Sequence, residues 1–295
     1  MAKRFAELKG TTGMGAPRAI TDLHSHLVPG VDDGAASVAE SLEALRQLRS
    51  EGVVRLVTTP HILLPRLDTD AAVERELERQ RRAFDTLRVA VAGREDVPAF
   101  ALGQEIWAPD VAQAARIARH PALGLGGTDY LLIEFGFDLQ GDHADVVALV
   151  LDTGRRVIVA HPERYAYLPE HDPIETMQRW RELGALLQVN VGSFGGHYLS
   201  GRPRSAELAW QMVELGIADV LSTDHHGPRR SGVSPAEAYA ALVARGHADD
   251  AHRLMELNPG AIARGDVVTP LSHPVAPVGE MPQHSPVSRR PPEAP

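Results

Sequence analysis

The sequence predicts a single α/β domain folded as a distorted, TIM-like (β/α)7 barrel. Seven short apolar runs recur at intervals of roughly thirty residues, and the stretches between them have the periodicity of amphipathic helices. The runs are almost continuously apolar, as expected for parallel strands that helices cover on both faces. At 295 residues the chain is long enough to bury the core of such a barrel.

The strands and helices alternate along the chain. Rich in β-branched and aliphatic residues, the predicted strands are 19–27, 53–61, 98–106, 129–135, 155–162, 185–193 and 218–226. The predicted helices are 37–52, 70–87, 108–120, 143–154, 173–184, 205–216 and 234–246. Several of these helices end in glycine, the residue that most easily adopts the left-handed conformation of a helix stop.

The two ends of the chain differ from this pattern. Residues 1–17 are predicted to be a flexible extension. They lack the apolar run of a secretory signal. Residues 267–295 are rich in proline and are predicted to be a disordered tail. The folded unit is therefore expected to span 18–266. No segment is apolar over the length of a membrane span, so a cytoplasmic protein without membrane insertion is expected.

Composition excludes several classes of function. A formal net charge of −9 argues against non-specific binding to nucleic acid or to an anionic membrane. The chain has no cysteine, which rules out disulfides, zinc-thiolate sites and phosphatases with a cysteine nucleophile.

Metal-competent or strongly polar residues stand where nearly every predicted strand ends. In chain order they are His24, His26, His61, Glu105, Glu134, His161, Asn190, Asp224 and His226. A single histidine at a strand end is more often structural, but ionisable residues are rarely buried without partners, and here they recur from strand to strand. Because the carboxyl ends of barrel strands converge on one mouth, the pattern predicts a metal site there.

The first strand runs into the segment DLHSHLVPGVDDG. His24 and His26 are two residues apart, so on a strand they share a face and can bind one ion. For Asp32 and Asp33, which follow a Pro-Gly turn, we expect turn and helix-cap roles rather than metal ligation.

This segment resembles the start of a PHP domain, and the motifs TTPH, GQEIW, LLIEF, VAHPERY and STDHH follow in the order of one branch of that superfamily. The branch is the metal-dependent protein tyrosine phosphatases of capsular and exopolysaccharide regulation, the CpsB/CapC/YwqE type. The resemblance extends from about Thr21 to the NPGAIARG segment at 258–265.

The resemblance implies a PHP fold and a cluster of up to three divalent ions, most often manganese. Mixed nitrogen and oxygen ligands by themselves also suit iron or zinc. The implied ligands are His24, His26, His61, Glu105, Glu134, His161, Asp224 and His226, with Glu105 bridging. Arg164 is the implied substrate-facing arginine, which can meet a phosphate with paired hydrogen bonds. The alternative for Arg164 is a surface salt bridge with Glu163.

Four further positions carry separate expectations. Ile62 stands where the family usually has a second histidine, which predicts a more apolar loop and an altered substrate preference. Arg229 and Arg230 are candidates for a further phosphate contact after the last motif. His225, between two implied ligands, is expected to point away from the site.

The implied activity is hydrolysis of phosphotyrosine in proteins by a metal-activated hydroxide, with the tail of a bacterial tyrosine autokinase as the expected substrate. A protonated Asp224 or a site histidine is the candidate acid for the leaving group. The first alternative is a small-molecule phosphatase acting on histidinol phosphate or a nucleotide. The second is an amidohydrolase-like metal hydrolase, and the third is a metal-binding module without catalysis.

Overall fold

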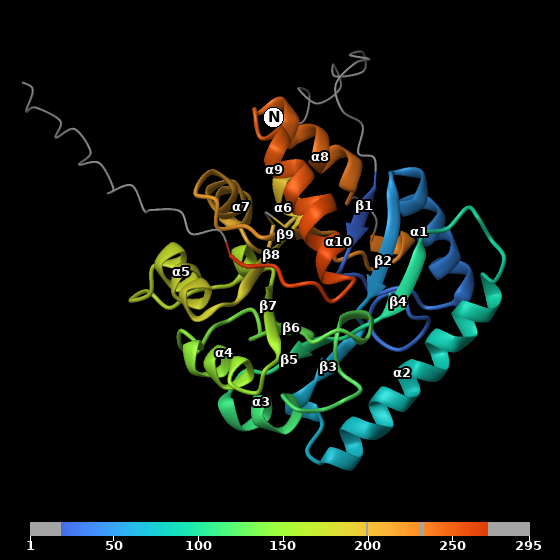
Figure 1. The fold of residues 1–295 in the computed structure, drawn as a ribbon, viewed down its shortest axis with the longest axis horizontal. Coiled ribbons are helices and arrows are strands. Elements are labelled where there is room, and N and C mark those ends of the chain that lie inside the picture. The colour runs from blue at the N-terminus through green and yellow to red at the C-terminus, as the bar shows by residue number, and fades with distance from the viewer. Residues whose placement is uncertain (1–18, 199, 231–232, 271–295) are drawn as a thin grey trace, which may run out of the picture.

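The computed structural model describes residues 19–198, 200–230 and 233–270. The predicted extension 1–17 and most of the predicted tail lie outside these residues. The described part is one α/β domain in which helices surround parallel strands (Figure 1), as the sequence predicts. Val268, beyond the predicted domain end, still contacts the domain, since its backbone N–H donates to the Tyr130 hydroxyl at 2.9 Å.

All paired strands are parallel, and they form two sheets. The strands are β1 (Ile20–Asp22), β2 (Val53–Thr58), β3 (His61–Leu63), β4 (Ala99–Leu102), β5 (Glu105–Trp107), β6 (Tyr130–Glu134), β7 (Arg156–Ala160), β8 (Leu186–Asn190) and β9 (Val220–Ser222). One sheet has the order β1-β2-β4 and the other has the order β3-β5-β6-β7-β8-β9.

Two of the seven predicted strands are each divided into two. The second run breaks between β2 and β3 at Pro60, which lacks the N–H that a ladder needs. The third run breaks between β4 and β5 at Gly103, where a Cβ would lie 2.9 Å from both Leu125 and Val57. These breaks allow both runs to leave the first sheet and continue in the second.

The first and last strands of the chain are also joined. Ser25 and His225, just beyond β1 and β9, form an isolated parallel bridge. The backbone N–H of His26 donates to the His225 carbonyl and that of Asp224 to the His24 carbonyl, each at 2.8 Å. These contacts bring the two ends of the strand series together.

All seven predicted helices are present, and three short helices were not predicted. The helices are α1 (Val38–Ser50), α2 (Asp70–Ala90), α3 (Val111–Ile117), α4 (Ala144–Leu151), α5 (Pro173–Leu183), α6 (Val191–Phe194), α7 (Ser205–Glu214), α8 (Pro235–Ala244), α9 (Ala248–His252) and α10 (Asn258–Ile262). The 3-10 turns are η1 (Leu64–Arg66), η2 (Leu125–Gly127), η3 (Pro162–Arg164) and η4 (Pro228–Arg230), and the π-helical turn η5 (Arg253–Leu257) joins α9 to α10. No helix of the described residues is long and apolar enough to cross a membrane.

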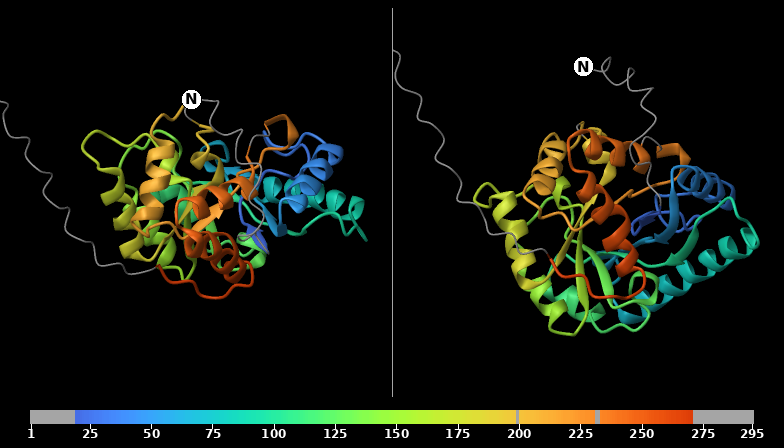
Figure 2. Two further views of the ribbon diagram at one scale, coloured as in Figure 1. Left: turned by 90° about the horizontal axis from the view of Figure 1, so that it is seen from above. Right: turned by 45° about the horizontal axis from the view of Figure 1, so that its top comes forward.

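Buried side chains form two layers that alternate along the strands. On β6, Leu131 and Ile133 belong to the larger cluster that packs against the helices, whereas Tyr130 and Leu132 belong to a smaller inner cluster. Ile262 of α10 joins this inner cluster, and Figures 1 and 2 show the C-terminal helices, orange to red, beside dark-blue β1. Because side chains alternate along a strand, Glu134 shares the inner face with Tyr130 and Leu132.

Candidate metal centre

Polar side chains gather where the strands of the second sheet and the segments beyond β1 and β9 meet. His24 and His26 follow β1, His61 and Glu105 begin β3 and β5, and Glu134 ends β6. His161 directly follows β7, and Asp224 and His226 follow β9. The structure therefore brings together all eight predicted ligands, which come from segments as far apart in the sequence as His24 and His226.

The first group of donor atoms surrounds the two histidines of the H-x-H motif. His24 Nε2 and His26 Nε2 lie 3.2 Å apart, and each is 3.3 Å from Glu105 Oε2. Asp224 Oδ1 lies 3.4 Å from His24 Nε2 and 3.2 Å from His26 Nε2. Donors bound to one ion at about 2.1 Å and at right angles are about 3 Å apart, so this spacing fits shared ligation.

Glu105 faces a second group with both of its oxygens. Its Oε1 lies 2.8 Å from His161 Nε2, and its Oε2 lies 2.9 Å from His61 Nδ1. Glu134 lies 3.9 Å from His61 and 4.0 Å from His161. The two oxygens of Glu105 thus point to different donors, as a bridging carboxylate requires.

A third group includes a residue that sequence reasoning assigned otherwise. Asp33 Oδ1 lies 3.4 Å from His61 Nε2 and 3.5 Å from His226 Nε2, and His26 completes the group. Asp33 thus contacts two of the predicted ligands, which its expected turn or cap role does not explain. The sequence signal that could have identified Asp33 is a second aspartate after an H-x-H motif and a tight turn.

Asp32 has a different role from its neighbour. Its Oδ2 accepts a hydrogen bond from His26 Nδ1 at 2.8 Å, and its Oδ1 accepts from the backbone N–H of Gly34 at 3.0 Å. The predicted turn contact is present, and the same carboxylate also orients a proposed ligand. At Gly34 a Cβ would lie 2.0 Å from the His26 carbonyl oxygen, so only glycine fits there.

The donor atoms fit divalent cations by their chemistry and by their lack of other partners. His61 Nδ1 and Glu105 Oε2 are buried 2.9 Å apart, and neither forms a hydrogen bond of good geometry. Burial, followed by repulsion from Glu105, raises the pKa of Glu134 to about 8. Burial opposes the charge on His61, but attraction by Glu105 and hydrogen bonds with Asp33 and Glu105 together outweigh it and raise the pKa of His61 to about 10. Such a cluster of carboxylates needs positive charge, from protons or from metal ions.

Arg164 lies at the edge of this cluster in η3. It donates from Nη1 to Asp224 Oδ2 at 2.5 Å, and its guanidinium carbon lies 4.0 Å from the Tyr198 ring centroid and 4.8 Å from that of Phe137. Its Nε is buried without a hydrogen-bond partner. The guanidinium thus lies against two aromatic rings, and its Nε is a donor that no group of the described residues uses.

The alternative of a surface salt bridge between Arg164 and Glu163 is wrong. Glu163 is 1% exposed and accepts hydrogen bonds from the Asn190 backbone N–H and the Ser193 hydroxyl. Burial raises the pKa of Glu163 to about 7. It therefore lies behind the site rather than on the surface.

The two arginines after the last motif separate. Arg230 lines the same cavity as the ligands, and its Nη1 donates to Asp33 Oδ2 at 2.7 Å. Arg229 is not among the residues that line this cavity and lies 3.2 Å from Glu40. The structure thus favours Arg230 over Arg229 as the second phosphate contact.

The cavity over the cluster is small and mostly polar. Its volume is about 210 Å³, and besides the predicted ligands its lining includes Phe137, His197, Tyr198 and Val233. His225, expected to point away, also contributes to the lining, although its Nδ1 accepts from the Gly227 backbone N–H. Ile62, by contrast, is fully buried in the core. Its side chain does not line the cavity.

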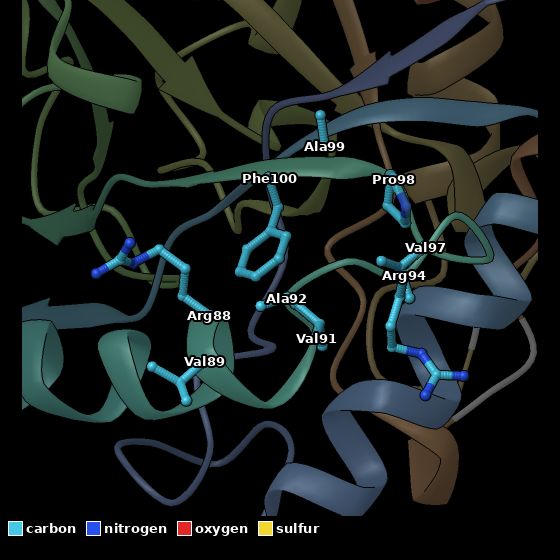
Figure 3. Close-up of a pocket in the computed structure, with 9 residues that line it drawn as sticks. All are labelled: Arg88, Val89, Val91, Ala92, Arg94, Val97, Pro98, Ala99 and Phe100. Carbon is cyan, nitrogen blue, oxygen red and sulfur yellow. The ribbon is translucent and has the colours of Figure 1, made fainter.

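A larger groove lies elsewhere on the molecule. Figure 3 shows this groove of about 590 Å³ between the end of α2 and β4, with Phe100 at its centre. Its lining holds arginine and apolar side chains but no histidine or carboxylate. The smaller cavity is therefore the candidate reaction site.

Comparison with known proteins adds to this geometry. The sequence model of the family "Capsular polysaccharide synthesis, CpsB/CapC" matches residues 20–264. Tyrosine-protein phosphatase YwqE of Bacillus subtilis is 29% identical over 75% of this chain and 83% of its own length. The putative tyrosine-protein phosphatase CapC of Staphylococcus aureus is 27% identical over 70% of this chain and 77% of its own length.

Solved structures give the same result. A chain from the crystal structures of YwqE from Bacillus subtilis and CpsB from Streptococcus pneumoniae, described as unique metal-dependent tyrosine phosphatases, matches with a TM-score of 0.68. The sequence identity is 25%, and the match covers 86% of this chain and 100% of the solved one.

Proposed function

This chain belongs to the CpsB/CapC family of capsular polysaccharide synthesis, and we propose that it is a metal-dependent phosphatase that hydrolyses phosphotyrosine in proteins. Its curated relatives are named tyrosine-protein phosphatases, and it covers more than three quarters of their lengths. The observation that carries the proposal is the convergence of the predicted ligands around Glu105, beside an arginine with an available edge.

We propose that the strands form the distorted seven-membered barrel of a PHP fold. Three observations support this arrangement: the strand series runs from β1 to β9, two of its members pass from one sheet to the other, and the Ser25–His225 bridge joins its ends. The inner apolar cluster then fills the barrel, and the metal centre lies at the carboxyl ends of the strands.

The donor groups support up to three divalent ions, for which manganese is the proposed metal. His24, His26 and Glu105, with Asp224 beside the two histidines, would hold the first, and His61, Glu105 and Glu134, with His161 beside Glu105, the second. His26, Asp33, His61 and His226 would share the third. The absence of sulfur ligands from these groups suits manganese and iron, and zinc also accepts such a site.

Divalent ions bound there would supply a hydroxide nucleophile near neutral pH and offset the charge of the phosphoryl oxygens. Arg164 adds donors on the side facing Phe137 and Tyr198, and Arg230 adds a cation at the mouth. The two rings fix the guanidinium plane, so the phosphate meets an arginine that is already oriented.

Of the two predicted roles of Asp224, ligand and general acid, we propose the ligand role. Burial alone would raise its pKa, but attraction by His24 and a hydrogen bond with His26 hold that pKa well below its usual range. An anionic Asp224 cannot supply a proton. A phenolate leaving group has less need of one, since free tyrosine has a pKa of about 10.

The lining of the cavity supports an aromatic ester as substrate. It includes Phe137, Tyr198 and Val233, against which the phenyl ring of a phosphotyrosine could pack. We propose a phosphotyrosine protein as the substrate, in particular the tail of a bacterial tyrosine autokinase in the cytoplasm.

The proposal is tested by measuring the metal content of the purified protein together with phosphate release from a phosphotyrosine peptide, with added Mn²⁺ and with chelator. We expect bound metal and release that Mn²⁺ stimulates and chelator abolishes. Faster phosphate release from histidinol phosphate or a nucleotide would show that the substrate is a small molecule. Activity on amides or lactones alone would show that the enzyme is not a phosphatase, and a protein without metal would refute the proposal.

A further inference from the structure

Strand β8 reaches the metal centre without supplying a predicted ligand. It presents two amides instead, Gln188 and Asn190, which are both 0% exposed. They are two residues apart on one strand and therefore share a face. Buried amides need partners for both their donor and acceptor atoms, so their contacts are informative.

The Gln188 amide has a fixed orientation. Its Oε1 accepts from the backbone N–H of His161 at 3.3 Å, and a backbone N–H can only donate. The same oxygen lies 3.0 Å from His24 Nδ1. Since an amide oxygen only accepts, His24 Nδ1 must carry a proton, which leaves Nε2 as its metal-facing nitrogen.

The Asn190 amide is fixed from its other end. Gln188 Nε2 donates to Asn190 Oδ1 at 2.7 Å. Asn190 Nδ2 then donates to Asp224 Oδ2 at 2.8 Å and contacts the Tyr198 hydroxyl at 3.2 Å. Asp224 thereby has one oxygen occupied, and its Oδ1 is the oxygen that faces His24 and His26.

The hydrogen bonds form one chain with a single direction, from His24 Nδ1–H through Gln188 and Asn190 to Asp224. We propose that Gln188 and Asn190 are positioning residues that hold His24 in its Nδ1–H tautomer and Asp224 as an oriented carboxylate, ready to bind the same ion. This inference rests on the proposed metal-dependent function. It adds to that function a hydrogen-bonded chain that orients His24 at one end and Asp224 at the other.

The expected effect is on metal affinity. Loss of a group that orients a ligand typically lowers metal affinity about 10- to 100-fold. Gln188→Met and Asn190→Leu keep the approximate volume of each side chain and remove its hydrogen bonds, so each should weaken Mn²⁺ binding by that factor. Asn190→Asp should weaken it most, because a second carboxylate would then face Asp224 where a donor now stands.

The experiment measures Mn²⁺ dissociation constants by chelator competition on the metal-free full chain, together with its free energy of unfolding. Ser222→Ala is the matched control. Ser222 is 1% exposed and accepts from the Leu23 backbone N–H, but contacts no proposed ligand atom. We expect this control to lose stability while its dissociation constant stays within about threefold of wild type.

The double variant Gln188→Met/Asn190→Leu tests whether the two residues act as one chain. Because either change breaks the same chain, the double variant should bind Mn²⁺ about as weakly as the weaker single variant. Multiplied single effects, or unchanged affinity with lower stability alone, would overturn the inference. Wild-type protein that binds no Mn²⁺ would instead overturn the proposed function.

The tautomer is a separate readout if one variant does not fold. Nitrogen-15 NMR of the metal-free protein, at a pH high enough that His24 is neutral, should identify His24 as the Nδ1–H form in wild type, and a mixture of forms in whichever of Gln188→Met or Asn190→Leu remains folded. An Nε2–H form in wild type would refute the proposed direction of the chain.

Discussion

Replacement of Arg164 by alanine should abolish most catalysis and leave the metal in place. In the structure one arm of the guanidinium is held by Asp224, its faces are covered by Tyr198 and Phe137, and Nε has no partner. The edge therefore offers about two charged hydrogen bonds to a phosphate. Each such bond contributes about 1.5–3 kcal/mol, and a single preorganised donor in an active site typically contributes about 2.7–4 kcal/mol.

Allowing for the loss of packing, we expect Arg164→Ala to raise the activation free energy by about 3–4 kcal/mol, which lowers kcat/KM roughly 100- to 1000-fold. Metal content should not change, because Asn190 still donates to the Asp224 carboxylate. The assay is steady-state hydrolysis of a phosphotyrosine peptide, paired with metal analysis of the same samples.

Arg202 is a suitable control. Its guanidinium carbon also lies over the Phe137 ring, at 4.9 Å, but it pairs with Asp138 and does not line the cavity. Arg202→Ala should therefore change kcat/KM by less than about threefold. A loss below about fivefold in Arg164→Ala, or equal losses in both variants, would refute the role assigned to Arg164.

Four other changes give distinct outcomes. His161→Ala should lose metal and activity together, since His161 Nε2 lies 2.8 Å from Glu105; an active, metal-loaded variant would contradict its ligand role. Gly34→Ala should displace the loop that carries Asp33, because its Cβ would lie 2.0 Å from a backbone oxygen, and should lower both melting temperature and metal stoichiometry. Tyr198→Leu should reduce kcat/KM for phosphotyrosine peptide more than for an alkyl phosphate, measured side by side. Burial lowers the pKa of His143, so the neutral buried side chain is compatible with full stability above about pH 6.5, and this stability is lost as the pH falls through the lowered pKa. His143→Asn removes the titrating group, and asparagine also tolerates the positive φ at this position. In chemical denaturation the variant should therefore lose less stability than wild type on acidification.

The convergence of the predicted ligands that end apolar runs was predictable from strand direction. Glu134 and His161 end consecutive apolar runs, and in parallel strands those ends must share one side. The division of the second and third runs was not predictable from periodicity. Gly103 marks one break only because Leu125 and Val57 approach it in three dimensions.

Contacts between distant residues were the least accessible to sequence reasoning. Arg164 and Asp224 are 60 residues apart, so the adjacent Glu163 looked like the natural partner of the arginine. Gln188 lies inside an apolar run, and nothing in its neighbours reveals that His24 lies beside it. Asp33 was assigned to a turn because its own segment explains it locally, whereas its histidine neighbours come from other strands.

The contacts between the segments that follow the first and last strands determine when the donor set is completed during synthesis of the chain. Asp22 accepts from the backbone N–H of Thr223, 201 residues later in the chain, and Asp224 and His226 follow directly. Contacts so distant in sequence form late in folding, since the intervening chain must be ordered first. A polypeptide still emerging from the ribosome thus has only part of its donor set. Phosphatase activity should therefore arise only after residue 226 has been released and has packed against the segment that follows the first strand.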